Sequence, residues 1–271
     1  HVSIWAVTIS LVRRMKNSGE NGNFDGEGFP KAGRIENDWR KWGLLEVFLG
    51  LLFGHLLAAF TYALAKGAGG YEDFSEYPMW LVSVANFPLQ GSMMLAAVFA
   101  ATYRGGGVVN DFLLRMKRND AVLGVSVGVA AQFFLVPALT YPVLWIFDKD
   151  IADIKRIAEE LTDRPSSPVG VVVLILFVGI FTPLAEELFF RGLLYGALRK
   201  KLNLTSAKCI WVSMVISSGV FSIVHFQLLL IPALFGVGIV FSFLYERTGR
   251  LAPAVWAHAG FNGVTLINLL F

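Results

Sequence analysis

Long apolar stretches, separated by short polar segments, set the pattern along most of the chain. Seven stretches are each about long enough to cross the roughly 30 Å hydrocarbon core of a bilayer as an α-helix. They cover residues 43–65, 79–101, 121–147, 168–198, 207–225, 228–245 and 251–271. Residues 1–12 are apolar but too short to span, and because the chain starts at His1 rather than Met, we expect them to end an earlier span. The pattern predicts an all-α, polytopic transmembrane helical bundle with seven full spans and a partial N-terminal span.

The composition agrees with a protein that is integral to a lipid bilayer. Hydrophobic residues occupy 55% of the 271 positions, charged residues occupy only 16%, and the mean hydropathy is +0.61. Because a soluble domain carries about 25% charged residues, this chain has too few polar side chains to cover a water-facing surface. The composition therefore excludes a soluble enzyme, a disordered regulator and a nucleic-acid binder. The single cysteine, Cys209, excludes an internal disulfide and a thiolate metal cluster.

Lysine and arginine are unevenly distributed between the segments that join the predicted spans. Seventeen of the 23 lie in segments 13–42, 102–120, 199–208 and 246–250, and five lie in the alternate segments. Because cytoplasmic loops are enriched in Lys and Arg, we expect the first set of segments to face the cytoplasm. The remaining cation, Arg191, falls inside a predicted span.

Ionisable residues inside the predicted spans concentrate in the last hundred residues, and they are functional candidates because their burial in hydrocarbon is costly. Glu187 and Arg191 are four residues apart with the acid first, so they share a helix face in the order that favours an ion pair. Glu186 lies about 100° around the helix from Glu187 and has no local partner. We therefore predict that Glu186 is a general base. The alternative is that this run forms only a buried salt bridge.

Two histidines on later spans are further candidates. His258 and Asn262 are four residues apart, so both can point into one cavity, where their N–H groups would suit a developing oxyanion. Phe221 and His225 have the same spacing, which predicts that the ring packs beside the imidazole. Considered alone, His225 or Asn262 can instead have a structural role, in which its side chain forms a hydrogen bond between two helices. His55, in the first full span, has no clustered partner and is interpreted as structural.

A metal site is the main alternative for this cluster. Glu186, His225 and His258 could bind zinc, because two imidazoles and a carboxylate with an open position form a catalytic zinc set. The sequence contains neither the HExxH pattern of zinc proteases nor the GxSxG pattern of serine hydrolases. We expect no cofactor, with zinc as the alternative.

Three short motifs follow one another in the chain: EExxxR at 186–191, FxxxH at 221–225 and HxxxN at 258–262. On these motifs the sequence resembles the CPBP family of intramembrane proteases, also called the Abi family, which includes the type II CAAX prenyl endopeptidases. The resemblance covers about residues 168–271. It implies an all-helical membrane fold whose site opens toward the cytoplasmic side.

The resemblance also implies a division of roles. Glu186 would activate water together with His225, and His258 and Asn262 would stabilise the oxyanion. The supporting residues would be Glu187, Arg191 and Phe221. We expect an intramembrane endopeptidase that cleaves a membrane-associated peptide or lipidated peptide, with a CAAX-type substrate as one candidate. The alternatives are a zinc-dependent protease and a non-catalytic bacteriocin-immunity or transport protein.

These expectations divide the chain into three parts. They are a partial span with a flexible cytoplasmic linker at 1–42, N-terminal transmembrane helices at 43–167 and catalytic helices at 168–271. One difficulty concerns depth, because helical rise places His258 about 10 Å, Glu186 about 20 Å and His225 about 25 Å from the cytoplasmic ends of their predicted spans. Tilt, a longer 168–198 helix or a different boundary near 205–228 would reconcile them.

Overall fold

The computed structural model describes residues 41–70, 76–154, 167–202 and 207–270, so the predicted partial span and nearly all of the linker lie outside the described residues. Every regular element in the described ranges is helical, which confirms the predicted all-α class. The elements, in chain order, are α2 (Leu44–Gly69), α3 (Met79–Arg104), α4 (Val108–Asp111), α5 (Asp120–Ala130), η3 (Ala131–Leu135), α6 (Val136–Ile146), α8 (Pro168–Leu176), η4 (Phe177–Phe181), α9 (Thr182–Glu187), η5 (Leu188–Leu194), α10 (Tyr195–Lys201), α11 (Ala207–Ile223), η6 (Leu228–Leu230), α12 (Ile231–Thr248) and α13 (Ala252–Leu270).

Five helical stretches of the described chain are long and apolar enough to cross a membrane. They are Leu44–Gly69, Trp80–Arg104, Asp120–Ile146, Pro168–Lys201 and Leu228–Thr248. The apolar part of α11 is shorter, and α13, which carries His258 and Asn262, is not among the five. The membrane-protein class is therefore supported, but the predicted count of seven full spans is not confirmed.

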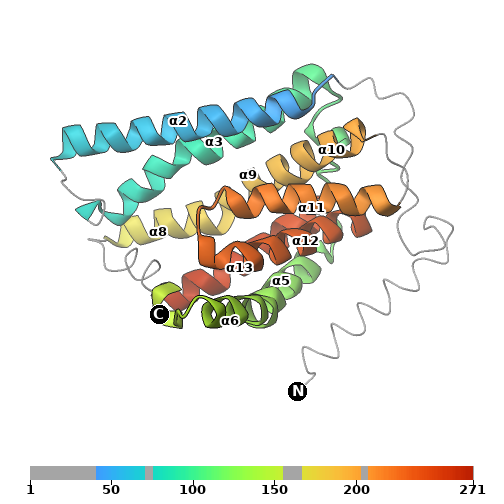
Figure 1. The fold of residues 1–271 in the computed structure, drawn as a ribbon. Helices are drawn as coiled ribbons and strands as arrows, with labels where there is room; N and C mark the ends of the chain where they lie inside the picture. The colour runs from blue at the N-terminus through green and yellow to red at the C-terminus, as the bar shows by residue number, and fades with distance from the viewer. Residues whose placement is uncertain (1–40, 71–75, 155–166, 203–206, 271) are drawn as a thin grey trace.

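The helices that carry the three motifs lie between two outer layers. In Figure 1, α2 and α3 run side by side along one edge of the bundle, and α5 and α6 lie along the opposite edge. The elements from α8 to α13 fill the space between these layers, with α13 packed along α5. One continuous hydrophobic core joins Val47 of α2 and Met93 of α3 to Phe189 and Phe241 of the motif-bearing helices.

Small residues allow the closest helix contacts, as the GxxxG spacings at 50–54 and 124–128 favour. A Cβ atom at Gly50 would lie 2.8 Å from the Ala96 Cβ of α3. A Cβ atom at Gly128 would overlap the Ala257 carbonyl, so α5 can approach α13 only with glycine at this position. Gly50 thus lets α2 pack closely on α3, and Gly128 lets the backbone of α5 contact that of α13.

Gly128→Val is expected to separate α5 from α13 and to destabilise the protein by about 1–3 kcal/mol, because the collision involves backbone rather than a movable side chain. Thermal unfolding in detergent measures the effect. Gly219→Val on α11 is the matched control, because no atom lies within 4 Å of a Cβ at that position. Equal melting temperatures for the two variants would contradict the packing argument.

The stretch from Pro168 to Lys201 is one helical segment of 34 residues with two π-helical turns inside it. A π-turn adds a residue and rotates the side chains that follow, and such turns are frequent at functional sites. All seven residues of η5 are buried, and η5 directly follows the two glutamates of the first motif. The local register therefore directs both glutamates and Arg191 into the core.

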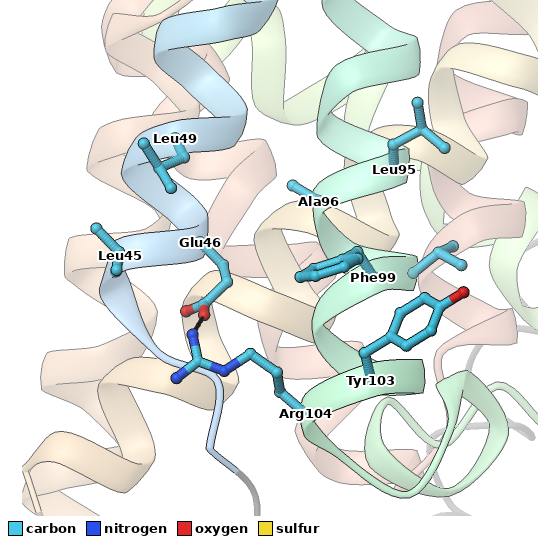
Figure 2. A pocket seen from close by; sticks show the side chains of 9 residues that line it. Leu45, Glu46, Leu49, Leu95, Ala96, Phe99, Tyr103 and Arg104 are labelled. Atoms are coloured by element: carbon cyan, nitrogen blue, oxygen red, sulfur yellow. Dashed lines mark hydrogen bonds and ion pairs between the residues drawn. The ribbon is translucent and has the colours of Figure 1, made fainter.

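Ion pairs connect helix ends that lie in or next to the segments predicted to face the cytoplasm. Glu46 at the start of α2 pairs with Arg104 at the end of α3 (Figure 2). Arg250, in the turn before α13, forms a bidentate pair with Asp120 at the start of α5. An apolar groove of about 500 Å³ lies beside the first pair, with Leu45, Leu49, Leu95, Phe99 and Tyr103 among its lining residues. These pairs hold the outer layers at one end of the bundle.

Candidate active site

Glu187 is the buried anchor of the site. Its Oε1 accepts a hydrogen bond from Arg191 Nη1 at 2.7 Å and lies 2.9 Å from His258 Nδ1. The side chains of Glu187 and Arg191 have no exposed surface, so the ion pair predicted from their spacing is present in the core. Glu187 therefore joins the first motif to α13 as well as to its own helix.

Arg191 extends this anchor to α11 and α12. Its Nη2 donates to the Gly238 carbonyl at 3.1 Å, and its guanidinium carbon lies 4.7 Å from the Phe221 ring centroid and 5.4 Å from that of Phe241. Such cation–π contacts are strongest where the cation is desolvated. The charge of Arg191 is thus balanced by Glu187 and two aromatic faces, which gives Arg191 a structural position.

Glu186 is also buried, but its carboxylate is bonded on one side only. Its Oε1 accepts a hydrogen bond from Gln90 Nε2 of α3 at 2.8 Å. Its Oε2 has no hydrogen-bond partner among the described residues and lies 3.9 Å from His225 Nε2 and 3.7 Å from His258 Nε2. The three motifs, which helical rise placed at different depths, therefore meet at one carboxylate oxygen.

The partners of the two histidines indicate which ring nitrogens carry hydrogen. His225 Nδ1 lies 2.6 Å from the Phe221 carbonyl oxygen, and His258 Nδ1 faces the Glu187 carboxylate. Because both oxygens are acceptors, each Nδ1 carries the hydrogen of the neutral ring. Both Nε2 atoms then present lone pairs toward Glu186 Oε2. The predicted packing of the Phe221 ring beside His225 is confirmed, with ring centroids 4.7 Å apart.

A cavity of about 390 Å³ adjoins Glu186 and His225. Most of its other lining residues come from α2, α3 and the segment that follows α11, among them His55, Gln90, Met93 and Phe226. The His225 side chain is 27% exposed, whereas His258 is 5% exposed. His225 therefore lies at the open side of the site, and His258 lies at its closed side.

The Asn262 amide is bonded to η4, which precedes the helix that carries the two glutamates. Its Nδ2 donates to the Val178 carbonyl of η4 at 2.8 Å, which leaves one amide hydrogen of Asn262 available. His258 directs its Nδ1 hydrogen to Glu187 rather than toward Asn262. The oxyanion role of the two residues stays a prediction, since the structure engages a hydrogen of each elsewhere.

Two residues at the site were not selected from the sequence. Gln90 is an uncharged residue on α3, 96 positions from the glutamate that it contacts, and no local spacing links the two. His55 was interpreted as structural because it has no neighbour in the sequence motifs. It lines the same cavity as Glu186 and His225, a position that local spacing does not predict. The sequence signal that could have identified His55 is that histidines are rare within membrane spans.

The donor atoms fit zinc in type but not in spacing. Two bare Nε2 atoms, each with its Nδ1 held by an oxygen, are typical of zinc-binding histidines. Around tetrahedral zinc, with bonds of about 2 Å, ligand atoms lie roughly 3.3 Å apart, whereas the Nε2 atoms here are 3.7 and 3.9 Å from Glu186 Oε2. In the part of the chain that the structure describes, no group of three or more His, Cys, Asp or Glu side chains is arranged to hold a metal ion.

The family model that matches the chain covers the helices that carry this cluster. Residues 168–264 match the family model described as type II CAAX prenyl endopeptidase Rce1-like. The chain is 34% identical over 95 residues to the "Membrane-embedded CAAX protease MroQ" of Staphylococcus aureus (strain USA300). The aligned region covers 35% of this chain and 38% of that protein. No solved structure matches the chain.

A longer but less similar match is the "Putative membrane peptidase YdiL" of Bacillus subtilis (strain 168), 29% identical over 157 residues, or 58% of this chain and 62% of that protein. An "Uncharacterized 24.3 kDa protein" of Escherichia coli is 29% identical over 154 residues, or 56% of this chain and 60% of that protein. The matches thus span about two fifths to three fifths of these relatives. The resemblance predicted from the three motifs is confirmed: residues 168–264 match the Rce1-like family model, and the chain is similar to proteins named as a CAAX protease and a putative membrane peptidase.

Proposed function

We propose that the protein is a membrane-embedded endopeptidase in which Glu186 activates a water molecule for attack on a peptide bond. The observation that carries the proposal is the geometry around Glu186 Oε2. This oxygen is buried, has no hydrogen-bond partner among the described residues and faces two imidazole Nε2 atoms. The buried ion pair with Arg191 is formed by the neighbouring Glu187, so the structural salt bridge does not require Glu186.

In the proposed mechanism, Glu186 and His225 act on the same water molecule. A water placed near Oε2 and His225 Nε2 is within reach of two proton acceptors, because these atoms are only 3.9 Å apart. Transfer of one water proton to the carboxylate leaves hydroxide to attack the carbonyl carbon of the scissile bond. The protonated Glu186 then returns this proton to the leaving amine. Gln90 holds the other carboxylate oxygen and so fixes the direction of Oε2.

The negative charge that develops on the carbonyl oxygen requires hydrogen-bond donors. We assign this role to His258 and to the second amide hydrogen of Asn262. His258 can donate from Nε2 only as an imidazolium, and Glu187, 2.9 Å from its Nδ1, would stabilise that charge. The buried Arg191 in turn balances Glu187. The assignment gives the second glutamate of the motif a role in orienting and charging His258.

The substrate we propose is a peptide segment at the membrane surface, with or without a lipid group. The cavity is lined largely by apolar side chains next to the catalytic carboxylate, which suits aliphatic residues on either side of the scissile bond. We place its opening toward the cytoplasmic side, as the resemblance to the CPBP family implies. A CAAX-type substrate matches this description and the name of the Staphylococcus aureus relative.

The test uses purified protein in lipid nanodiscs and a short fluorogenic peptide ending in Cys-Val-Ile-Met, here called the test peptide. The peptide is supplied in unmodified and farnesylated forms. Cleavage of either form supports an endopeptidase, and the ratio of the two rates identifies the lipid preference. Intact peptides of both forms, at protein concentrations that exceed the peptide, would favour an immunity or transport protein.

Metal dependence is tested by chelation. We expect that an excess of a strong chelator leaves the rate of test-peptide cleavage within about twofold, because Glu186 and His225 suffice as proton acceptors for water. Atomic spectroscopy of the treated protein shows whether metal has been removed. Loss of activity on chelation, with recovery on addition of zinc alone, would replace this mechanism by one in which Glu186, His225 and His258 bind zinc.

A further inference from the structure

The wall of the active-site cavity that faces His225 is built by α2 and α3. Each helix contributes one buried polar atom without a hydrogen-bond partner among the described residues: His55 Nε2 from α2 and Gln90 Oε1 from α3. Buried polar atoms in native proteins are nearly always hydrogen-bonded, so such an atom requires an explanation. Two of them in the cavity that contains the catalytic carboxylate point to a ligand.

The chemistry of His55 Nε2 follows from its other ring nitrogen. His55 Nδ1 lies 2.8 Å from the Leu51 carbonyl oxygen, which can only accept, so Nδ1 carries the hydrogen of the neutral ring. Nε2 is then a hydrogen-bond acceptor. The edge of the ring contacts Phe226, with centroids 5.9 Å apart, and this contact fixes the ring orientation at the cavity. His55 therefore offers one acceptor and no further donor.

Gln90 offers a second acceptor for a similar reason. Its Nε2 donates to the Glu186 carboxylate at 2.8 Å, and this bond determines which end of the amide is nitrogen. The carbonyl oxygen is left on the other side. Asn86 lines the same wall one helical turn earlier, and its Nδ2 donates to Tyr62 Oη at 2.6 Å and to the Val82 carbonyl at 2.9 Å. Asn86 is held by the protein itself.

We propose that His55 Nε2 and Gln90 Oε1 bind the main chain of the substrate by accepting hydrogen bonds from its amide N–H groups. The inference rests on the proposed function, because it assigns the α2 and α3 wall as the peptide-binding side of that cavity. Amide N–H groups are the donors that every peptide carries, whatever its side chains. Recognition through them lets aliphatic side chains occupy the apolar remainder of the cavity. His55 is a binding residue in this assignment, and Gln90 both binds substrate and positions Glu186.

The first experiment replaces His55 by Phe, which keeps an aromatic ring against Phe226 and removes the acceptor. We expect the KM of the test peptide to rise about fivefold with kcat nearly unchanged, as for the loss of one hydrogen bond. The dissociation constant of a labelled, uncleaved copy of the peptide, measured by fluorescence anisotropy, should rise equally. Thr61→Val is the matched control, because Thr61 Oγ1 also bonds a carbonyl one turn back on α2 but does not line the cavity.

The second experiment separates the two roles of Gln90. Gln90→Leu is expected to lower kcat, since it releases Glu186, so the rate alone is not diagnostic. Peptides in which one non-scissile amide is replaced by an ester lack a single N–H group. The parent should prefer the amide over the ester about fivefold at the position that Gln90 binds. In Gln90→Leu this preference should disappear for that ester and persist for the ester at the position bound by His55.

The outcomes are distinguishable from failure of the proposed function. If the parent binds the peptide but does not cleave it, the endopeptidase proposal fails, while anisotropy with the amide and ester peptides still tests the wall. Unchanged affinity in His55→Phe, together with an unchanged amide-to-ester preference in Gln90→Leu, would overturn the inference. A parent that does not bind the test peptide in either form would overturn it as well.

Discussion

Glu186→Gln is expected to lower kcat for the test peptide by about a thousandfold, because it removes the proton acceptor for the attacking water. The substitution preserves the shape of the side chain, and a glutamine Oε1 can still accept the hydrogen bond from Gln90. KM should change little, since the substrate-binding atoms proposed above are retained. Initial rates in nanodiscs, over a range of peptide concentrations, separate the two constants.

The matched control for this variant is Glu46→Gln. Glu46 is also a buried carboxylate, with 7% of its surface exposed. It differs from Glu186 because it pairs with Arg104 and does not line the cavity that contains Glu186. We expect Glu46→Gln to retain the parental kcat within about threefold. Melting temperatures must show that both variants are folded. A folded Glu186→Gln protein with parental activity would show that Glu186 is not the base.

Arg191→Met is expected to destabilise the protein by about 3–5 kcal/mol, because it leaves the buried charge of Glu187 without its partner. It also removes the hydrogen bond to the Gly238 carbonyl and both cation–π contacts. For a chain of this length the loss corresponds to a fall in melting temperature of roughly 10 °C. Thermal unfolding in detergent, followed by tryptophan fluorescence, measures it.

The charge argument is tested by a second substitution in the same background. Glu187→Gln with Arg191→Met leaves no unpaired charge, and the glutamine oxygen can still accept from His258 Nδ1. The double variant should therefore be more stable than Arg191→Met alone. If the double variant is instead less stable than Arg191→Met, and its loss equals the sum of the losses in Glu187→Gln and Arg191→Met, the destabilisation by Arg191→Met arises from lost packing. An uncompensated carboxylate would then not be its cause.

The parts of the fold that sequence reasoning predicted are those with local causes. Apolar runs long enough to cross a bilayer specify helices because backbone groups in hydrocarbon must bond within their own segment. The Glu187–Arg191 pair and the Phe221–His225 contact are present because a four-residue spacing places side chains one above the other. The predicted count of seven full spans is not confirmed, because α11 is shorter and polar side chains lower the hydropathy of α13.

The parts that were missed depend on contacts between distant segments. Gln90 and His55 belong to helices without any of the three motifs, and they reach the site only because α2 and α3 pack against the η5 helix. The contact of His258 with Glu187 was not predicted for the same reason. Spacing offers Asn262, one turn away, whereas packing brings His258 to Glu187, 71 residues earlier in the chain. The π-turn η5 also has no sequence signature that periodicity detects.

By itself, the sequence determined that this is a helical membrane protein, which residues within its spans are ionisable and which pairs share a helix face. These properties follow from transfer free energy and helical period, and both act over a few turns of one helix. Only the tertiary structure decided that Glu186 Oε2, His225 and His258 meet, that Gln90 and His55 join them, and that Glu187 is the anchor. Those relations arise from the close approach of separate helices, which depends on small residues and π-turns far apart in the chain.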